Sequence, residues 1–285
     1  MNDTPQASNT HLQESTSRVT PAQADHLKRM AAIRGQDADG SVDPMHFDGL
    51  ASSYGSARPP YPAALWRDIL ATGLVEPGRR ALDLGAGSGE ATGELVAHGI
   101  NVVAIEPGEN LAAILEERFP TATVIRSRAE DIRLENASFD LAIAATSIHW
   151  MDLDVVLPLV RAALNDEGRL MVWRNVFGAP DVEVTPFRRG IQRIVERRGT
   201  TREGNPEDLE LTAAKIAATH HFTVEQFHRY RWSIELSADQ VYALFATFSD
   251  WSDSEARQAA SIAEALGGTV TEHYTSWLIN ARPNR

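Results

Sequence analysis

Three glycines at alternate positions follow an acidic residue in the stretch ALDLGAGSGE, Ala81 to Glu90. Gly85, Gly87 and Gly89 come directly after an apolar run that contains Asp83. Because glycine has no Cβ, this stretch lets the backbone turn sharply and lets a ligand lie against the start of a helix. A dinucleotide fingerprint, G-x-G-x-x-G, would require a glycine where Glu90 stands, so the spacing argues against a nicotinamide cofactor. A turn that binds no ligand is the alternative.

Two further stretches carry groups suited to binding. Glu106 ends the apolar run of VVAIEPGENL, where a carboxylate can accept hydrogen bonds from two hydroxyl groups; a solvated loop residue is the alternative. His149 and Trp150 are adjacent in SIHWMD. An indole can donate one hydrogen bond while its ring excludes water, and a neutral histidine can donate another or act as a base near pH 7. Packing of Trp150 under its loop is the alternative.

These residues lie between segments that alternate in type. Strands are expected at 79–84, 101–106, 122–126, 139–146 and 168–176, with helices at 89–99, 108–119 and 153–164 between them. Strands joined by single helices predict a doubly wound, mostly parallel α/β sheet that gathers ligands at the carboxyl ends of its strands. Two long alternating runs, 222–236 and 267–283, predict a C-terminal antiparallel pair.

Composition excludes several classes of function. The 39 acidic and 27 basic side chains give a net charge of -12, which opposes binding to nucleic acid. Without cysteine the chain has no disulfide, and the adjacent His220 and His221 lack the spacing of metal ligands, so no metal is expected. With neither a signal peptide nor an apolar run of membrane-spanning length, we expect a soluble, cytoplasmic protein that binds no membrane.

The acidic residue followed by G-x-G-x-G resembles the first motif of class I S-adenosylmethionine-dependent methyltransferases. Glu106, the SRAED turn at 127–131 and the antiparallel C-terminal pair extend the resemblance over roughly residues 47–283. It implies a Rossmann-like fold with S-adenosylmethionine as the cofactor. In this family the acid after the second strand accepts both ribose hydroxyls, the turn lies at the adenine edge, and the end of the fourth strand flanks the methionine part.

The resemblance also implies roles for individual residues. Asp131 competes with Glu130 for the side-chain contact to adenine. The dipeptide His149-Trp150 resembles the H-W of trans-aconitate-type and plant carboxyl methyltransferases, which implies catalytic roles for both residues, with the indole holding the acceptor carboxylate. The implied cofactor-binding residues are Tyr54, Arg58, Asp83, Gly85, Ala86, Gly87, Gly89, Glu106, Pro107, Ala129, Glu130, Ala145 and Thr146.

We expect two regions in the chain. Residues 1–45 are poor in large apolar side chains and should form a flexible tail, in which 22–34 could be a short helix. Residues 46–285 should form the methyltransferase domain, with lid segments at 47–62, 177–221 and 237–268. In the first lid, YGSARPPYP resembles a segment of small-molecule methyltransferases in which Tyr54 would cover the sulfonium and Arg58 would pair with a carboxylate of the cofactor or the substrate. A proline-stiffened connector is the alternative.

The resulting hypothesis is transfer of the methyl group of S-adenosylmethionine to a small-molecule acceptor, a carboxylate or another oxygen or nitrogen nucleophile. Two alternatives stay open: a cyclisation or rearrangement on the same cofactor-binding fold, and a non-catalytic subunit that binds the cofactor.

Overall fold

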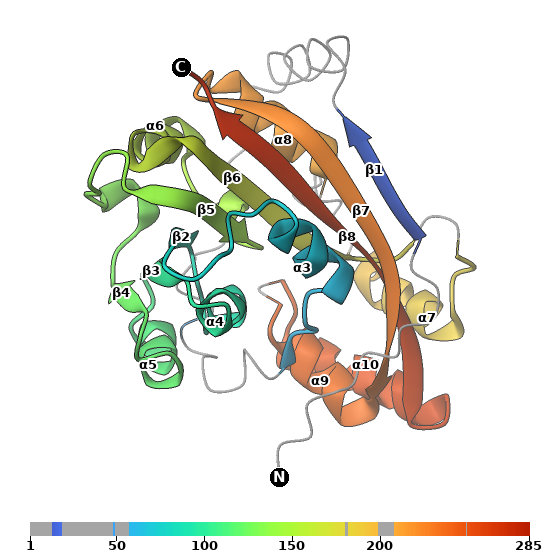
Figure 1. Ribbon diagram of the computed structural model, residues 1–285. Helices are drawn as coiled ribbons and strands as arrows, with labels where there is room; N and C mark the ends of the chain where they lie inside the picture. Colours follow the sequence, from blue (N-terminus) through green and yellow to red (C-terminus); the bar gives the residue numbers. More distant parts are fainter. Residues whose placement is uncertain (1–12, 19–47, 49–56, 180–181, 199–207, 249) are drawn as a thin grey trace.

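The computed structural model describes residues 13–18, 48, 57–179, 182–198, 208–248 and 250–285. Its strands are β1 (Gln13–Arg18), β2 (Arg80–Leu84), β3 (Asn101–Ile105), β4 (Thr123–Ile125), β5 (Phe139–Ala145), β6 (Leu164–Phe177), β7 (Phe222–Ser237) and β8 (Thr269–Pro283). They form one sheet in the order β1-β7-β8-β6-β5-β2-β3-β4 (Figure 1).

The pairing of the strands confirms the doubly wound topology. The five strands β2 to β6 pair in parallel, with β2 between β3 and β5. β8 pairs antiparallel with both β6 and β7, which confirms the predicted C-terminal pair. Chain connections leave β2 and β5 in opposite directions across the sheet, and such a switch point is where doubly wound sheets bind ligands.

Helices cover both faces of the sheet. They are α3 (Ala63–Leu70), α4 (Glu90–Ala97), α5 (Glu109–Arg118), α6 (Leu153–Ala163), α7 (Pro186–Glu196), α8 (Leu209–Ala218), α9 (Ala238–Ala246) and α10 (Asp253–Ala265). On one face Leu82 and Leu84 of β2 belong to an apolar cluster with residues of α6 and α8; on the other, Ala81 belongs to a cluster with residues of α3, α4 and α5. Alternate residues of a strand point to opposite faces, so Asp83 shares the face of α4.

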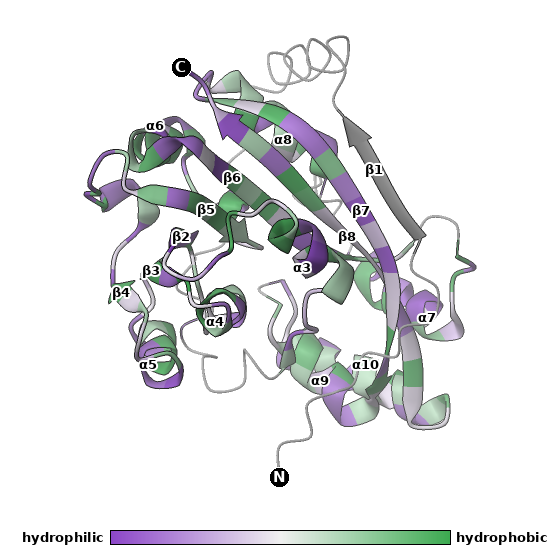
Figure 2. Cartoon of the chain, in the orientation of Figure 1, coloured by the Kyte–Doolittle hydropathy of each residue, from purple (hydrophilic) through white to green (hydrophobic). Residues whose placement is uncertain are grey.

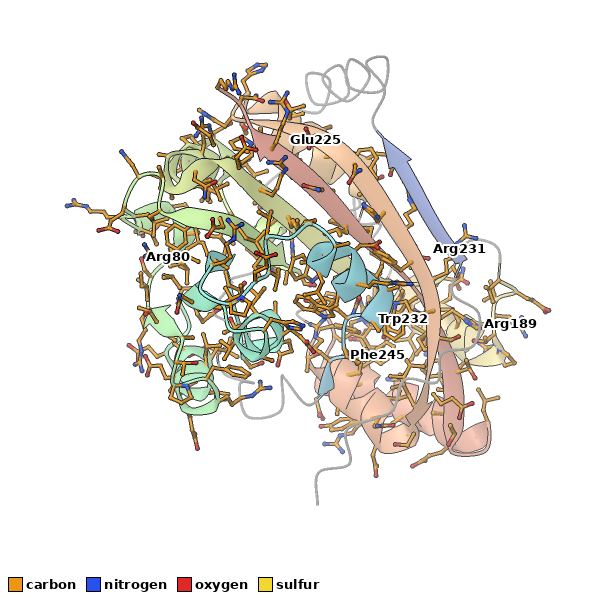
Figure 3. The ribbon with its side chains drawn as sticks, in the orientation of Figure 1. Arg80, Arg189, Glu225, Arg231, Trp232 and Phe245 are labelled. Carbon is orange, nitrogen blue, oxygen red and sulfur yellow. The ribbon has the colours of Figure 1, made fainter. Side chains whose placement is uncertain are left out.

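A third apolar cluster lies beyond the parallel strands. β7 and β8 continue past the end of β6, and hydrophobic and hydrophilic residues alternate along this part of β7 (Figure 2). Their distal ends and the helices α7, α9 and α10 form a cluster that includes Tyr274, Trp232 and Phe245, the last two labelled in Figure 3. We call these three helices the cap.

Two findings differ from the expected domain organisation. Residues 13–18, inside the segment expected to be flexible, form β1 and pair antiparallel with β7 from Gln13↔Arg231 to Arg18↔Gln226. The open edge of β7 provides the hydrogen-bonding groups for this strand. Helix α8, inside the expected lid 177–221, instead packs in the core through residues such as Ile216. The sequence pattern predicted neither contact, because both depend on what lies beside the segment in space.

Candidate functional site

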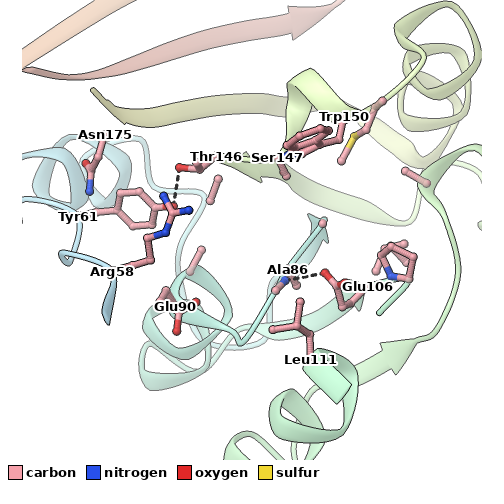
Figure 4. Close-up of a pocket in the computed structure, with 18 of the residues that line it drawn as sticks. Arg58, Tyr61, Ala86, Glu90, Glu106, Leu111, Thr146, Ser147, Trp150 and Asn175 are labelled. Carbon is pink, nitrogen blue, oxygen red and sulfur yellow. Dashed lines mark hydrogen bonds between the residues drawn. The ribbon is translucent and has the colours of Figure 1, made fainter. Parts of the chain in front are cut away.

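A pocket of about 220 Å³ opens at the carboxyl ends of the parallel strands (Figure 4). The loops after β2, β3, β4 and β5 line one end, which we call the cofactor end: Gly85, Ala86, Gly87, Ile105, Glu106, Pro107, Leu111, Arg128, Ala129, Glu130 and Met151. The other end, which we call the acceptor end, is lined by Arg58, Pro59, Tyr61, Asn175, Phe177, Leu244, Phe248 and Tyr274. Glu90, Ala91, Ala145, Thr146, Ser147 and Trp150 lie between the two.

The glycine loop after β2 forms a wall of the pocket and needs glycine for its backbone. Gly85, Gly87 and Gly89 have φ angles of 66°, 59° and 90°, a region that residues with a Cβ rarely adopt. A Cβ on Gly85 would also lie 2.6 Å from the Cβ of Ser147. Gly89 does not line the pocket; a Cβ there would collide with Leu115 of α5, so its reason for being glycine is helix packing.

Glu106 lies at the end of β3 opposite the glycine loop. Its Oε2 accepts a hydrogen bond from the backbone N–H of Gly87 at 2.8 Å, and its Oε1 accepts one from Gly108 at 2.9 Å. The side chain is 6% exposed, and burial raises its pKa although both hydrogen bonds oppose the shift. Each carboxylate oxygen has a second lone pair, so Glu106 fixes the loop and can still accept from a ligand.

Asp83 lies beneath the glycine loop and does not line the pocket. It is fully buried, and its Oδ2 accepts a hydrogen bond from the hydroxyl of Thr92 at 2.7 Å, while Oδ1 has no hydrogen-bond partner. Burial raises the pKa of Asp83 to about 7, with Glu106 and Glu90 adding to the rise. The carboxyl group therefore joins β2 to α4 under the loop.

The end of β5 carries a backbone geometry that is unusual for its residue type. Thr146 has φ 61° and lines the pocket, and its backbone N–H is fixed by the carbonyl oxygen of Trp173 at 2.8 Å. Its Oγ1 shares a hydrogen bond with the hydroxyl of Tyr61 at 3.0 Å (Figure 4). Left-handed geometry in a β-branched residue is strained and concentrates at functional sites.

The predicted His149-Trp150 pair forms the 3-10 turn η3 (Ile148–Trp150), but only Trp150 lines the pocket. His149 lies against the indole, with ring centroids 4.6 Å apart, and its Nδ1 is 3.0 Å from the guanidinium Nη1 of Arg174. Since a guanidinium can only donate, Nδ1 accepts and the proton of the neutral ring is on Nε2. Burial, with the charges of Arg174 and Arg58, holds the pKa of His149 well below its usual value.

Arg58 connects the segment before α3 to the cap. Its Nη2 donates to the carbonyl oxygen of Thr247 at 3.1 Å, and its guanidinium lies 4.8 Å from the ring centroid of Phe248. These contacts join Arg58 to the two residues that follow α9, and its expected pairing with a ligand carboxylate stays a prediction.

The structure brings together ten of the thirteen predicted cofactor residues. Arg58, Gly85, Ala86, Gly87, Glu106, Pro107, Ala129, Glu130, Ala145 and Thr146 line one pocket. Asp83 and Gly89 support it from behind, and Tyr54 lies outside the described residues. Glu130 accepts from the backbone N–H of Asp152 at 2.9 Å, whereas the competing Asp131 is exposed and does not line the pocket.

Of the acceptor-end residues the sequence singled out Arg58 alone, although the expected lid segments 47–62, 177–221 and 237–268 contain five of the others. Tyr61 lies in the quoted YGSARPPYP segment, and Asn175 lies near the end of the fifth parallel strand. The sequence features that identified the other site residues could therefore have identified these two as well. Leu244, Phe248 and Tyr274 come from the C-terminal third and carry no local signal. Asp48, also missed, accepts hydrogen bonds from the backbone N–H groups of Asn110 and Leu111 and so caps the start of α5.

Over the described part of the chain, no three metal-ligating side chains come together. No helix there is long and apolar enough to cross a membrane.

Comparisons with known proteins agree with this geometry. Residues 82–172, from β2 to β6, match the family model described as a methyltransferase domain. An uncharacterized methyltransferase of Mycobacterium tuberculosis is 29% identical over 208 residues, which is 72% of this chain and 77% of that protein. An uncharacterized methyltransferase-like protein of Schizosaccharomyces pombe is 24% identical over 210 residues, 73% of this chain and 79% of its own length.

A solved structure of a candidate type II methyltransferase from Anaeromyxobacter dehalogenans superposes with a TM-score of 0.57 at 26% identity, covering 80% of this chain and 97% of that one. Phosphoethanolamine N-methyltransferase 2 of Haemonchus contortus superposes with a TM-score of 0.51 at 18% identity, over 86% of this chain and 61% of its own. At that identity the second likeness shows the shared fold.

Proposed function

The chain belongs to the class I S-adenosylmethionine-dependent methyltransferases, and we propose that it methylates a small-molecule acceptor at a carboxylate or at another oxygen or nitrogen nucleophile. One observation carries the proposal. A single pocket extends from Glu106 and the glycine loop, past Trp150, to Arg58, so the groups suited to a cofactor and those suited to an acceptor border one cavity. Its opening lies at the switch point of the sheet, where this fold binds ligands.

The chemistry of the cofactor end fits S-adenosylmethionine. Glu106 offers the remaining lone pairs of two carboxylate oxygens to the ribose hydroxyls, and Gly87 leaves space beside it. Ala129 and Glu130 would border the adenine, and Leu111 would pack against its face. When bound, this cofactor supplies a methyl group that is already activated for transfer to a nucleophile.

Asp83 would act on the cofactor through the loop rather than by contact. Its hydrogen bond to Thr92 joins the strand before the glycine loop to the helix after it. Because the glycine loop lies between these two anchors, we assign Asp83 the role of a positioning residue.

The residues next to the acceptor position it rather than remove its proton. Trp150 lines the pocket and would hold the acceptor. The neutral His149, with its proton on Nε2, does not line the pocket and is a poor base, because burial and the charges of two arginines lower its pKa by disfavouring its protonated form. A carboxylate acceptor arrives ionised and needs no base, which favours that acceptor over a phenol or an amine.

The test is transfer of an isotopically labelled methyl group. Wild-type protein is incubated with methyl-labelled S-adenosylmethionine and, in separate reactions, with carboxylic acids, phenols and amines, and products are detected by mass spectrometry. We expect label in a methyl ester. Consumption of the donor without a labelled product would contradict the proposal and indicate a cyclisation or rearrangement. Label in an amine or an aryl ether alone would restrict the acceptor to those classes.

A further inference from the structure

The cap supplies part of the acceptor end, and this part is apolar. Leu244 of α9 and Phe248, two residues beyond its end, line the pocket together with Phe177 of β6 and Tyr274 of β8. These four residues come from three separate elements and bring one aliphatic and three aromatic side chains to one cavity. Phe177 and Phe248 remain partly exposed, so the pocket leaves apolar surface open to a ligand.

Phe248 is in contact with other groups of this region on several sides. Its ring lies 5.3 Å from Phe177 in an edge-to-face contact and 5.3 Å from Phe245 in another. On a further side the guanidinium of Arg58 stacks on it at 4.8 Å. Edge-to-face pairs and cation–π contacts each favour one ring orientation, so Phe248 is held in place before any ligand binds.

Two polar side chains at this end, those of Asn175 and Tyr61, already bind other parts of the protein. Asn175 donates to the carbonyl oxygens of Pro59 and Pro60, and its Oδ1 accepts from Ser276 at 2.6 Å. The hydroxyl of Tyr61 is hydrogen-bonded to Thr146. Among the described residues lining the acceptor end, Arg58 carries the one formal charge. A polar or multiply charged acceptor would therefore lose hydration here and gain few hydrogen bonds.

We propose that the acceptor end selects a molecule with an extended apolar or aromatic body, a hydrophobic monocarboxylic acid, and that Phe248 is the residue that determines this specificity. The inference rests on the proposed function and adds the chemical class of the acceptor. Arg58 would lie beside the carboxylate of the acceptor. The apolar body of the acceptor would be buried against the wall formed by Phe177, Leu244, Phe248 and Tyr274.

The test is a binding series that separates the body from the charge. Butanoate, hexanoate, octanoate and 3-phenylpropanoate, the alkanols of the same chain lengths, and propane-1,2,3-tricarboxylate are titrated calorimetrically into the full chain saturated with S-adenosylhomocysteine. Burying one methylene contributes about 0.8 kcal/mol, so we expect affinity to rise about fourfold per added methylene in both acids and alkanols. The tricarboxylate should bind more weakly than hexanoate.

Three variants test the role of Phe248. Phe248→Ala should flatten the chain-length dependence, and Phe248→Leu should restore most of it by refilling the wall with an apolar side chain. Tyr242→Ala is the matched control: it removes an aromatic ring of the neighbouring helix α9 that lines no part of the pocket. Unchanged affinity for S-adenosylhomocysteine in every variant reports that the fold and the cofactor end are intact.

Each outcome bears on one proposal. Affinity that does not depend on chain length, or a tricarboxylate that binds more tightly than hexanoate, would overturn the inference while leaving methyl transfer to be judged by the labelling assay. Full chain-length dependence in Phe248→Ala would overturn the role of that residue. Alkanols that bind as tightly as the acids would support the apolar wall and contradict the carboxylate.

Discussion

Replacing the buried Asp83 by asparagine should stabilise the protein at neutral and alkaline pH. The carboxyl is fully buried with one hydrogen bond, from Thr92, and burial raises its pKa from 3.8 to about 7. The folded state therefore holds a proton that the unfolded chain releases above pH 3.8. The contribution of the Asp83 carboxyl to the free energy of unfolding is therefore fully present below that pH and is lost as the pH rises through 7. Asparagine keeps an oxygen that can accept the hydrogen bond from the Thr92 hydroxyl, and its side chain cannot ionise.

The magnitude follows from the size of the pKa rise. Each unit corresponds to about 1.4 kcal/mol, so the rise from 3.8 to about 7 costs the wild type up to about 4 kcal/mol at pH 8. We expect the free energy of unfolding of Asp83→Asn to exceed that of the wild type by up to that amount at pH 8. This difference in stability should shrink steadily as the pH falls toward 4. Urea unfolding followed by circular dichroism at several pH values measures it, with the exposed Asp131→Asn as control. A difference that does not vary with pH would refute the reasoning.

Three further predictions concern the pocket and its support. Glu106→Ala should weaken binding of S-adenosylhomocysteine by about 10- to 150-fold in calorimetric titration, the effect of about 1.5 to 3 kcal/mol for bonds to a charged group, while the exposed Glu109→Ala on α5 should bind like wild type. Trp150→Phe keeps the ring and loses the donor, so the KM for the acceptor should rise roughly fivefold with cofactor affinity unchanged; an unchanged KM would return Trp150 to a packing role. Gly89→Ala should lower the free energy of unfolding by about 1 to 3 kcal/mol, because φ is 90° and the new Cβ would collide with Leu115; wild-type stability in thermal unfolding would contradict this.

The parallel half of the fold was predictable because its signals are local. The glycines after β2, the acid after β3 and the alternation of apolar strands with amphipathic helices each lie within a few residues of the structure they determine. The resemblance to methyltransferases implied that Glu106, Ala129 and Thr146 lie at the cofactor, and all three line one pocket at the edge where the carboxyl ends of the parallel strands meet.

The side chains around His149 could not be read from the sequence. The turn η3 directs Trp150 into the pocket and His149 toward Arg174, and which side each residue takes depends on how β6 lies beside it. The same holds for Asp83, whose burial under the loop follows from the packing of α4. A pattern of residue types identifies such groups but not the direction in which they point.

The individual residues of the acceptor end could not be predicted for a different reason. Phe248 reaches the pocket through the long extensions of β7 and β8 that carry the cap, more than a hundred residues along the chain from the glycine loop. Its contact with Arg58 joins two segments that are far apart in the sequence, and no pattern in either segment indicates this contact. Contacts of this kind arise from tertiary packing alone.

A crystal structure of the full chain with S-adenosylhomocysteine tests the central claim most directly. The account predicts the adenosine at the cofactor end, with both ribose hydroxyls within hydrogen-bonding distance of the Glu106 carboxylate and the thioether sulfur directed toward Trp150 and Arg58. A nucleoside bound elsewhere, or a Glu106 carboxylate that touches only Gly87 and Gly108 as it does without ligand, would contradict it.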